Sequence, residues 1–312
     1  METTPVGALA GIGNTPLVEL VRMVPPGSAH VLAKLEFANP TGSMKDRMAR
    51  AAIEGAARDG RLRPGDTVVE YTAGTTGISL AFVCAALGYG LHIVFSDAFS
   101  VEKRRTMLAF GAIVEDVPSD AGRITETLIK SMIARAGEVA AQPGRWWCDQ
   151  LNNHDAILGY MPLGQEIWTQ TGGRIDAFVH VVSTAHSIHG AVRAMRAHGA
   201  PLHVTAVEPA ESAVLSGGPS GSHKIEGIGI GFIPPLWEPD QVDEIQTVTT
   251  DEAIAMARRL AREEGLFAGA SSGANVVVAL RVAERLGPDA TVVTILCDSG
   301  LRYLSTDLYR ET

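Results

Sequence analysis

The residue best suited to covalent chemistry is a lysine at the junction between a predicted strand and a predicted helix. Lys45 lies in the segment Asn39–Arg47, which follows an apolar run and opens a helical pattern. The positive end of a helix dipole disfavours the charged form of a lysine in the first turn. An uncharged amine can attack an aldehyde, so this position favours Schiff-base chemistry. Taken alone, the position also fits a solvated lysine.

Three further loops stand between a predicted strand and a predicted helix and carry small hydroxyl side chains. The loop Thr72–Gly77 could hold a carboxylate with its threonines and backbone N–H groups, or its threonines could simply cap the helix. The loop Ser183–Gly190 could hold a phosphate at the start of the following helix. In the loop Gly269–Ala274, either Ser271 or Ser272 could be a simple N-cap.

Short apolar runs alternate with helical patterns along the chain. The predicted strands are His30–Glu36, Thr67–Tyr71, His92–Ser96, Ala112–Val117, Ala177–Val182, His203–Val207 and Thr291–Cys297. The predicted helices are Lys45–Ala57, Gly77–Leu87, Val101–Phe110, Ile124–Ala136, Asp155–Thr171, Ile188–Ala197, Asp251–Glu264 and Ser272–Leu286. Because the strands are apolar on both faces and alternate with helices, we expect an α/β fold with mostly parallel sheets flanked by helices. Ligands in such folds lie beyond the carboxyl ends of the strands, where these loops stand.

Length and composition indicate a globular protein of two lobes. The 312 residues are long for one core, and 46% hydrophobic with 20% charged residues is ordinary for a soluble protein. A formal charge of −9 without a run of Lys or Arg argues against binding to nucleic acid. Met1–Pro5 does not resemble the start of a signal peptide. The apolar stretch Ile78–Phe95 is interrupted by Gly88, Gly90 and His92, which predicts a buried helix and strand rather than a membrane span. We therefore expect a cytoplasmic protein.

Several other kinds of site are disfavoured by spacing. The three cysteines are far apart and show no C-x-x-C spacing, which argues against a disulfide framework and a structural zinc site. The segment Gly227–Gly231 lacks the dinucleotide-binding spacing, and both the P-loop and the H-E-x-x-H pattern are absent. No carboxylate or cysteine stands at ligand spacing from three neighbouring histidines, so no metal is expected. These histidines are His180, His186 and His189.

Six segments in order resemble the cysteine synthase family of fold-type II enzymes, which use pyridoxal 5′-phosphate (PLP) and include O-acetylserine sulfhydrylases and cystathionine β-synthases. The segments cover nearly the whole chain and are Ile12–Leu17, Pro40–Arg47, Thr72–Gly77, Lys224–Pro234, Gly269–Ala274 and Asp298–Thr306. The resemblance implies a tryptophan synthase β-like fold of two lobes with PLP between them. It implies a smaller mobile α/β domain at residues 43–146 and a larger PLP-binding α/β domain made of residues 1–42 and 147–312. It also implies a homodimer.

The resemblance assigns a role to individual residues. Lys45 is similar to the catalytic lysine that forms the Schiff base with PLP and moves the substrate proton. The residues that match a cofactor-binding role, besides Lys45, are Thr75 near the ring hydroxyl, Ser271 at the pyridine nitrogen, and Ser183, Thr184, Ala185, His186 and Ser187 at the phosphate. The residues that match a substrate-binding role are Thr72, Ala73, Gly74, Thr76 and Gln150 at the α-carboxylate, and Gly227 at the mouth of the site.

Two loops depart from the family pattern. The carboxylate loop of the family is Thr-Ser-Gly-Asn-Thr-Gly, whereas this chain has Ala73 in place of the serine and Thr75 in place of the asparagine. The phosphate loop of the family is Gly-Thr-Gly-Gly-Thr, whereas this chain has Ser-Thr-Ala-His-Ser at Ser183–Ser187. Each added Cβ restricts the positive φ angles that let backbone N–H groups converge on a phosphate. The departures put phosphate binding in question.

The resemblance implies β-replacement on an O-activated serine or on cysteine, through an enzyme-bound α-aminoacrylate to which a thiol or another nucleophile adds. A serine hydroxyl gives the pyridine nitrogen no permanent positive partner, so the ring is a weaker electron sink and loss of a β-leaving group is favoured. The altered loops are compatible with a specialised role, such as synthesis of a non-protein amino acid. Two alternatives stay open. One is a lyase that converts cysteine or serine to pyruvate and ammonia. The other is a non-catalytic family member with a damaged phosphate loop.

Overall fold

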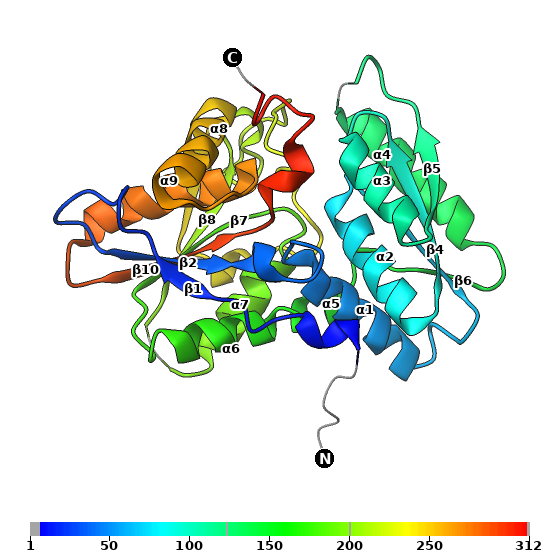
Figure 1. Ribbon diagram of the computed structural model, residues 1–312, viewed down its shortest axis with the longest axis horizontal. Coiled ribbons are helices and arrows are strands. Elements are labelled where there is room, and N and C mark those ends of the chain that lie inside the picture. The colour runs from blue at the N-terminus through cyan, green and yellow to red at the C-terminus, as the bar shows by residue number, and fades with distance from the viewer. Residues whose placement is uncertain (1–6, 123, 200, 311–312) are drawn as a thin grey trace. The chain divides into compact units, whose positions relative to one another are not determined.

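The computed structural model describes residues 7–122, 124–199 and 201–310 of the chain. By their contacts these residues form two units (Figure 1). Unit 1 holds the described residues of Met1–Ile12 and Asn39–Gly159, and unit 2 holds those of Gly13–Ala38 and Tyr160–Thr312. Met1–Pro5, on which the expectation about a signal peptide rests, lies outside the described residues. The functional domain bounds expected at residues 43 and 146 stay a prediction.

Unit 1 contains a four-stranded parallel sheet with the order β5-β4-β3-β6. The strands are β3 (Thr67–Tyr71), β4 (Gly90–Ser96), β5 (Ile113–Val117) and β6 (Arg145–Trp147). The helices are α1 (Lys45–Arg58), α2 (Thr75–Leu87), α3 (Val101–Ala109), α4 (Glu126–Ala140) and α5 (His154–Leu158). Helix α4 packs on β3, β4 and β6, and α1 packs on α2 and α5. The two central strands, β3 and β4, are almost entirely buried, as their apolar sequences require.

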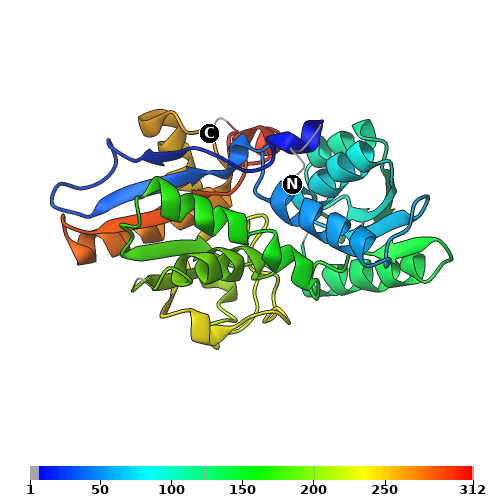
Figure 2. The same ribbon diagram turned by 90° about the horizontal axis from the view of Figure 1, so that it is seen from below.

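Unit 2 contains a six-stranded sheet with the order β1-β2-β10-β7-β8-β9. Its strands are β1 (Leu17–Glu19), β2 (His30–Leu35), β7 (Ala177–Val181), β8 (His203–Pro209), β9 (Glu244–Val248) and β10 (Thr291–Leu296), and only β1 pairs antiparallel. Helices α8 (Thr250–Arg259) and α9 (Ala270–Leu286) cover one face of this sheet, and α6 (Met161–Gln170) and α7 (His186–Arg196) cover the other (Figure 1). Figure 2 shows α6 and α7 from their own side, in front of the sheet.

The predicted α/β fold with mostly parallel sheets is confirmed, and all seven predicted strands are present within two residues of their expected bounds. The sequence did not predict β1, β6 and β9. The first two have only three residues each, and β9 is half-buried with polar side chains, so none of them is a long apolar run. The stretch Ile78–Phe95 lies in α2 and β4, as predicted. Within the described residues, no helix combines the length and the apolar character that a membrane span needs.

One helix prediction was wrong, because Asp155–Thr171 is two helices rather than one. Helix α5 ends at Leu158, where Gly159 allows close packing: a Cβ there would lie 2.7 Å from Ala51 Cβ and 2.8 Å from the carbonyl oxygen of Arg47. The next helix, α6, begins at Met161 with Pro162 in its first turn. A proline has no N–H to donate to a preceding turn, so it starts a helix more readily than it continues one.

Candidate active site

Lys45 is the first residue of α1, and a tight turn fixes the start of that helix. The side chain of Asp46 folds back on this turn. Its carboxylate accepts hydrogen bonds from the backbone N–H of Thr41 at 2.8 Å and from the Thr41 hydroxyl at 2.6 Å. Gly42 has a φ of +79°, a left-handed conformation that suits glycine. A carboxylate in the first turn also interacts favourably with the helix dipole. Asp46 therefore holds the half-buried Lys45 at a defined place in unit 1.

The loop Thr72–Gly77 follows β3 and leads into α2, as the sequence predicted. Gly74 is the N-cap of α2 with a φ of +117°, and its N–H donates to the Thr72 hydroxyl at 2.9 Å. A Cβ on Gly74 would lie 2.5 Å from Cδ of Lys103, a lysine whose side chain is buried. The first N–H groups of a helix have no intrahelical acceptor, so the start of α2 offers donors to a carboxylate. Thr75 and Ala73 are half-buried beside these donors.

Gln150 comes together with this loop although 74 positions separate it from Thr76. The Thr76 hydroxyl donates to Oε1 of Gln150 at 2.9 Å, and Nε2 of Gln150 donates to the carbonyl of Tyr71 at 2.8 Å. Unit 1 thus unites Gln150 with the residues that were expected to bind the substrate carboxylate.

Glu70 is a residue of this region that the sequence analysis did not single out. It is fully buried, and its carboxyl oxygens accept from the backbone N–H groups of Tyr71 at 3.0 Å and Gln150 at 2.9 Å. Burial raises the pKa of Glu70 to about 8, and the bonds from Gln150 and Tyr71 oppose that rise. The available signal was a carboxyl group within the apolar run Thr67–Tyr71.

In unit 2, the loop Ser183–Ser187 connects β7 to α7. Ala185 is the N-cap of α7 and has the left-handed conformation, with φ of +68° and ψ of −8°. Ser183 and His186 do not have positive φ. Oγ1 of Thr184 and Nδ1 of His186 are 3.0 Å apart. Of the three positions where the family pattern has glycine, only Ala185 has a positive φ in this chain, at a cost of about 1–2 kcal/mol.

These features fit a phosphate. The loop keeps its turn, so the first N–H groups of α7, an eleven-residue helix, converge at its start. The hydroxyls of Ser183, Thr184 and Ser187 lie in the same segment. A phosphate needs several hydrogen-bond donors, and this loop supplies both backbone and hydroxyl donors without its glycines.

Ser271 lies in the first turn of α9, a helix that packs against β10. The N-cap of α9 is Gly269, so the simple N-cap interpretation is wrong for both Ser271 and Ser272. The Ser272 hydroxyl instead accepts from the backbone N–H of Cys297 at 2.9 Å. Ser271 is buried, and one turn later Asn275 accepts from the backbone N–H of Val181 at 2.7 Å. Unit 2 thus places Ser271 on a helix that contacts β7, the strand that leads into the loop Ser183–Ser187.

Gly227 lies in a glycine-rich loop of unit 2, with a φ of +91°. In that loop, the backbone N–H of Gly229 donates to the carbonyl of Val182 at 3.2 Å, next to Ser183. Nε2 of His223 lies 2.9 Å from the carbonyl oxygen of Gly229. The expected mouth residue is therefore near the end of β7.

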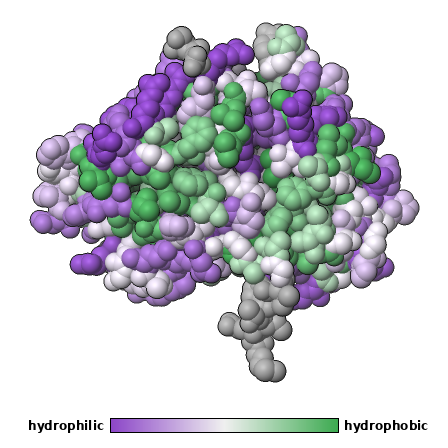
Figure 3. Space-filling view, in the orientation of Figure 1, coloured by the Kyte–Doolittle hydropathy of each residue, from purple (hydrophilic) through white to green (hydrophobic). Residues whose placement is uncertain are grey.

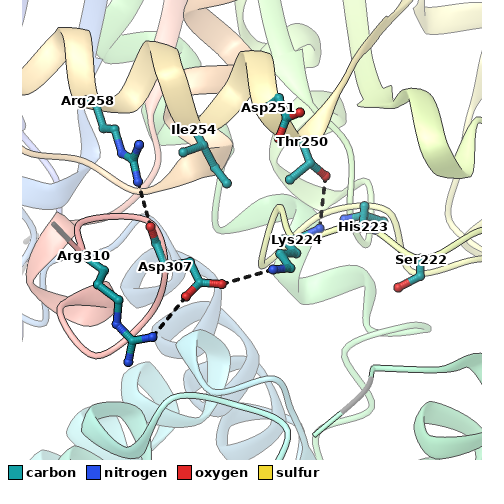
Figure 4. A pocket seen from close by; sticks show the side chains of 9 residues that line it. All are labelled: Ser222, His223, Lys224, Thr250, Asp251, Ile254, Arg258, Asp307 and Arg310. Atoms are coloured by element: carbon teal, nitrogen blue, oxygen red, sulfur yellow. Dashed lines mark hydrogen bonds and ion pairs between the residues drawn. The ribbon is translucent and has the colours of Figure 1, made fainter. Parts of the chain in front are cut away.

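A cavity of about 510 Å³ adjoins this loop on the side of α8 (Figure 4). Lys224 and Arg310 both point toward Asp307, at 3.0 Å and 3.6 Å, and Arg258 donates to the backbone carbonyl of Asp307 at 2.8 Å (Figure 4). Lys224 lowers the pKa of Asp307. The cationic groups of this cavity are thus engaged with the C-terminal segment, and none of the expected site residues lines it.

The three histidines weighed as metal ligands have separate hydrogen-bond partners. Nε2 of His180 is 2.8 Å from Oγ of Ser187, and Nε2 of His189 accepts from the backbone N–H of Glu238 at 3.0 Å. Burial lowers the pKa of His189 to about 4, so this ring is neutral at pH 7. In the part of the chain that the structure describes, no cluster of three or more His, Cys, Asp or Glu side chains could hold a metal ion.

Comparison with known proteins places the chain. The model of a family described as pyridoxal-phosphate dependent enzyme matches residues 8–298. A cysteine synthase of Staphylococcus aureus is 41% identical over 300 residues, covering 96% of this chain and 95% of that protein. A crystal structure of cysteine synthase from Entamoeba histolytica has a TM-score of 0.90 and 35% identity, covering 100% of this chain and 92% of that one. An O-ureido-L-serine synthase has a TM-score of 0.91 and 36% identity, covering 97% and 95%.

Proposed function

Because the chain belongs to the pyridoxal-phosphate dependent enzymes, within the cysteine synthase family, we propose that it catalyses β-replacement on an O-activated serine. In this reaction the bond between the β-carbon and the activated oxygen breaks, and a thiol or another nucleophile bonds to that carbon. The protein is a transferase that uses PLP, as the sequence resemblance predicted.

The residues of unit 2 would hold the cofactor. The start of α7 and the hydroxyls of Ser183, Thr184 and Ser187 would bind the phosphate, and the hydroxyl of Ser271 would bind the pyridine nitrogen. When bound, PLP withdraws electrons from the substrate α-carbon. A neutral serine partner limits that withdrawal, which favours loss of the β-leaving group over longer-lived carbanion chemistry.

The residues of unit 1 would act on the amino acid. Lys45 would hold the cofactor covalently until the amino group of the substrate displaces it. Its amine, then free, would take the proton from the substrate α-carbon. The N–H groups at the start of α2 would bind the α-carboxylate, with the Thr72 hydroxyl beside them. Gln150 would keep this loop in place, because it bonds to both Thr76 and the carbonyl of Tyr71.

The observation that carries this proposal is the conformation of Ala185. Its left-handed φ at the N-cap of α7 supports a phosphate-binding turn there, although the glycines of the family pattern are absent. The same observation speaks against the non-catalytic alternative, which was based on those missing glycines.

The test is a product assay on the purified protein supplied with PLP, O-acetylserine and sulfide. We expect cysteine and acetate in equal amounts, and no product from Lys45→Ala. Pyruvate and ammonia formed at the same rate with and without sulfide would instead identify the lyase. If sulfide gives no product, a panel of other nucleophiles tests for a specialised product. Complete inactivity with every nucleophile and every activated serine would refute the proposal.

We further propose that the protein is a cytoplasmic homodimer. The dimer is carried over from the family resemblance. Apolar residues at the surface are consistent with it (Figure 3). Leu108, Phe110 and Ile113 of unit 1 are 38–59% exposed. Light scattering of the purified protein measures its mass in solution, and a mass of one chain would exclude the dimer.

A further inference from the structure

A line of three hydrogen-bonded polar side chains lies beneath the phosphate loop, and two of them are fully buried. Asn275 in α9 and His180 in β7 have 0% and 1% of their surface exposed, and Ser187 in α7 stands at the end of the line. Nδ2 of Asn275 is 3.3 Å from Nδ1 of His180, and Nε2 of His180 is 2.8 Å from Oγ of Ser187. Burying a polar group costs free energy unless each donor meets an acceptor, so the direction of each hydrogen bond matters.

The backbone fixes the orientation of the Asn275 amide. The N–H of Val181 lies 2.7 Å from Oδ1 and can only donate, so that atom must be the oxygen. The other amide atom is then nitrogen, which suits its 2.7 Å distance from the carbonyl oxygen of Ile295. The nitrogen carries two protons and no free lone pair, so it also donates toward Nδ1 of His180. Sγ of Cys297, 3.5 Å from the same nitrogen, is also within hydrogen-bond distance for sulfur. It leaves the assignment unchanged, because Nδ1 of His180 still faces an atom that can only donate.

The orientation of Asn275 in turn selects the tautomer of His180. A neutral imidazole has one donor and one acceptor nitrogen. Because Nδ1 accepts from Asn275, the ring proton is on Nε2, and Nε2–H donates to Oγ of Ser187. The Ser187 hydroxyl then uses a lone pair toward His180 and keeps its own proton for another acceptor.

We propose that Asn275 and His180 are positioning residues that turn the Ser187 hydroxyl into a fixed donor to the phosphate of the cofactor. This inference rests on the proposed function, in which Ser187 binds that phosphate. A hydroxyl that already accepts one bond from below has fewer orientations to lose when an anion binds, so binding costs less entropy. A fixed donor of this kind adds to the backbone donors of a loop that has lost its glycines.

The first experiment is a double-mutant cycle on cofactor binding to the full-length apoprotein, with His180→Phe, Ser187→Ala and the double variant. Dissociation constants are measured for PLP and for pyridoxal, which lacks the phosphate. We expect PLP binding to weaken about tenfold in Ser187→Ala, since a hydrogen bond to a charged group is worth about that factor. His180→Phe frees the hydroxyl to rotate among about three staggered orientations, so it should weaken PLP binding about threefold, and the double variant should bind no more weakly than Ser187→Ala. Pyridoxal binding should change less than about twofold. His189→Phe is the matched control, a buried histidine of α7 whose Nε2 accepts from the backbone N–H of Glu238.

Two outcomes of the cycle would overturn the proposed positioning role of His180. One is a His180→Phe effect of the same size with and without the Ser187 hydroxyl. The other is an equal loss of PLP and pyridoxal affinity, which would indicate a general structural role. Failure of the wild-type protein to bind PLP at all would overturn the proposed function itself, and the inference with it.

The second experiment measures the tautomer directly in the wild-type protein. Nitrogen-15 NMR of the histidine side chains in the wild-type apoprotein distinguishes the two ring protonation states, with His180→Phe used only to assign the signal. We expect His180 to carry its proton on Nε2. A proton on Nδ1 would contradict the proposed positioning role, because Ser187 would then have to direct its own proton toward His180.

Discussion

Replacing Gly74 by alanine should destabilise unit 1 through two separate effects. The backbone there has a φ of +117°, where L side chains are strained by about 1–3 kcal/mol. The new Cβ would also lie 2.5 Å from Cδ and 2.8 Å from Cβ of Lys103, which is 1% exposed. Overpacking of that kind costs about 1–3 kcal/mol. We expect Gly74→Ala to lower the free energy of unfolding by about 2–6 kcal/mol.

The other end of the same helix provides the matched control. Gly88 is the C-cap of α2 with a φ of +78°, and no heavy atom lies within 4 Å of the Cβ that alanine would add. Gly88→Ala should therefore show the conformational cost alone, about 1–2 kcal/mol. Urea unfolding of the apoproteins, followed by circular dichroism, measures both variants. Equal destabilisation by the two substitutions would refute the claim that Lys103 packs rigidly against Gly74.

Three further predictions concern the buried groups of the site. The pKa of Glu70 is about 8 in the fold against 4.5 ordinarily, so the folded state binds a proton more tightly than the unfolded state, and stability should fall as pH rises from about 5 to 8. Glu70→Gln should flatten this dependence of Tm on pH, and an unchanged slope would contradict the prediction. Ala185→Gly should change the free energy of unfolding by less than about 1 kcal/mol, because relief of strain and the gain in chain entropy oppose each other, and a tenfold loss of PLP affinity would show that the alanine Cβ is needed. In Gln150→Glu, an oxygen replaces the amide nitrogen that now lies 2.8 Å from the carbonyl oxygen of Tyr71, so two acceptors face each other. The variant also places a negative charge near the expected carboxylate site. KM for the amino acid should therefore rise at least about tenfold relative to Gln150→Met.

The long apolar elements of the fold were predictable because a run of consecutive apolar residues indicates a buried strand or helix. Strand β3 has the predicted bounds, Thr67–Tyr71, and four of its five residues are buried. Strand β9, Glu244–Val248, mixes polar and apolar side chains at one edge of its sheet, so nothing in its local sequence separates it from a loop. The break between α5 and α6 depends on the approach of Gly159 to Arg47, which is a contact between distant positions.

Some parts of the candidate site could also be predicted from the sequence, and others could not. The loops that carry Lys45 and Ser187 were found from their place between strand and helix and from the family resemblance. The conformation of Ala185 could not be predicted, because alanine ordinarily avoids a positive φ and only the surrounding fold holds it there. The contact between His180 and Asn275 joins residues 95 positions apart, and the orientation of the amide depends on a backbone N–H of β7. Such hydrogen bonds follow from the packed structure and have no local sequence signal.

The most direct test of the central claim is to find which lysine bonds to the cofactor. The purified protein is incubated with PLP, its visible spectrum is recorded, the bond is reduced with borohydride, and the modified peptide is identified by mass spectrometry. We predict a visible absorbance band in the wild-type protein, its absence in Lys45→Ala, and a modification on the peptide that contains Lys45. A protein that stays colourless with PLP, or a modification on another lysine such as Lys103, would contradict the account.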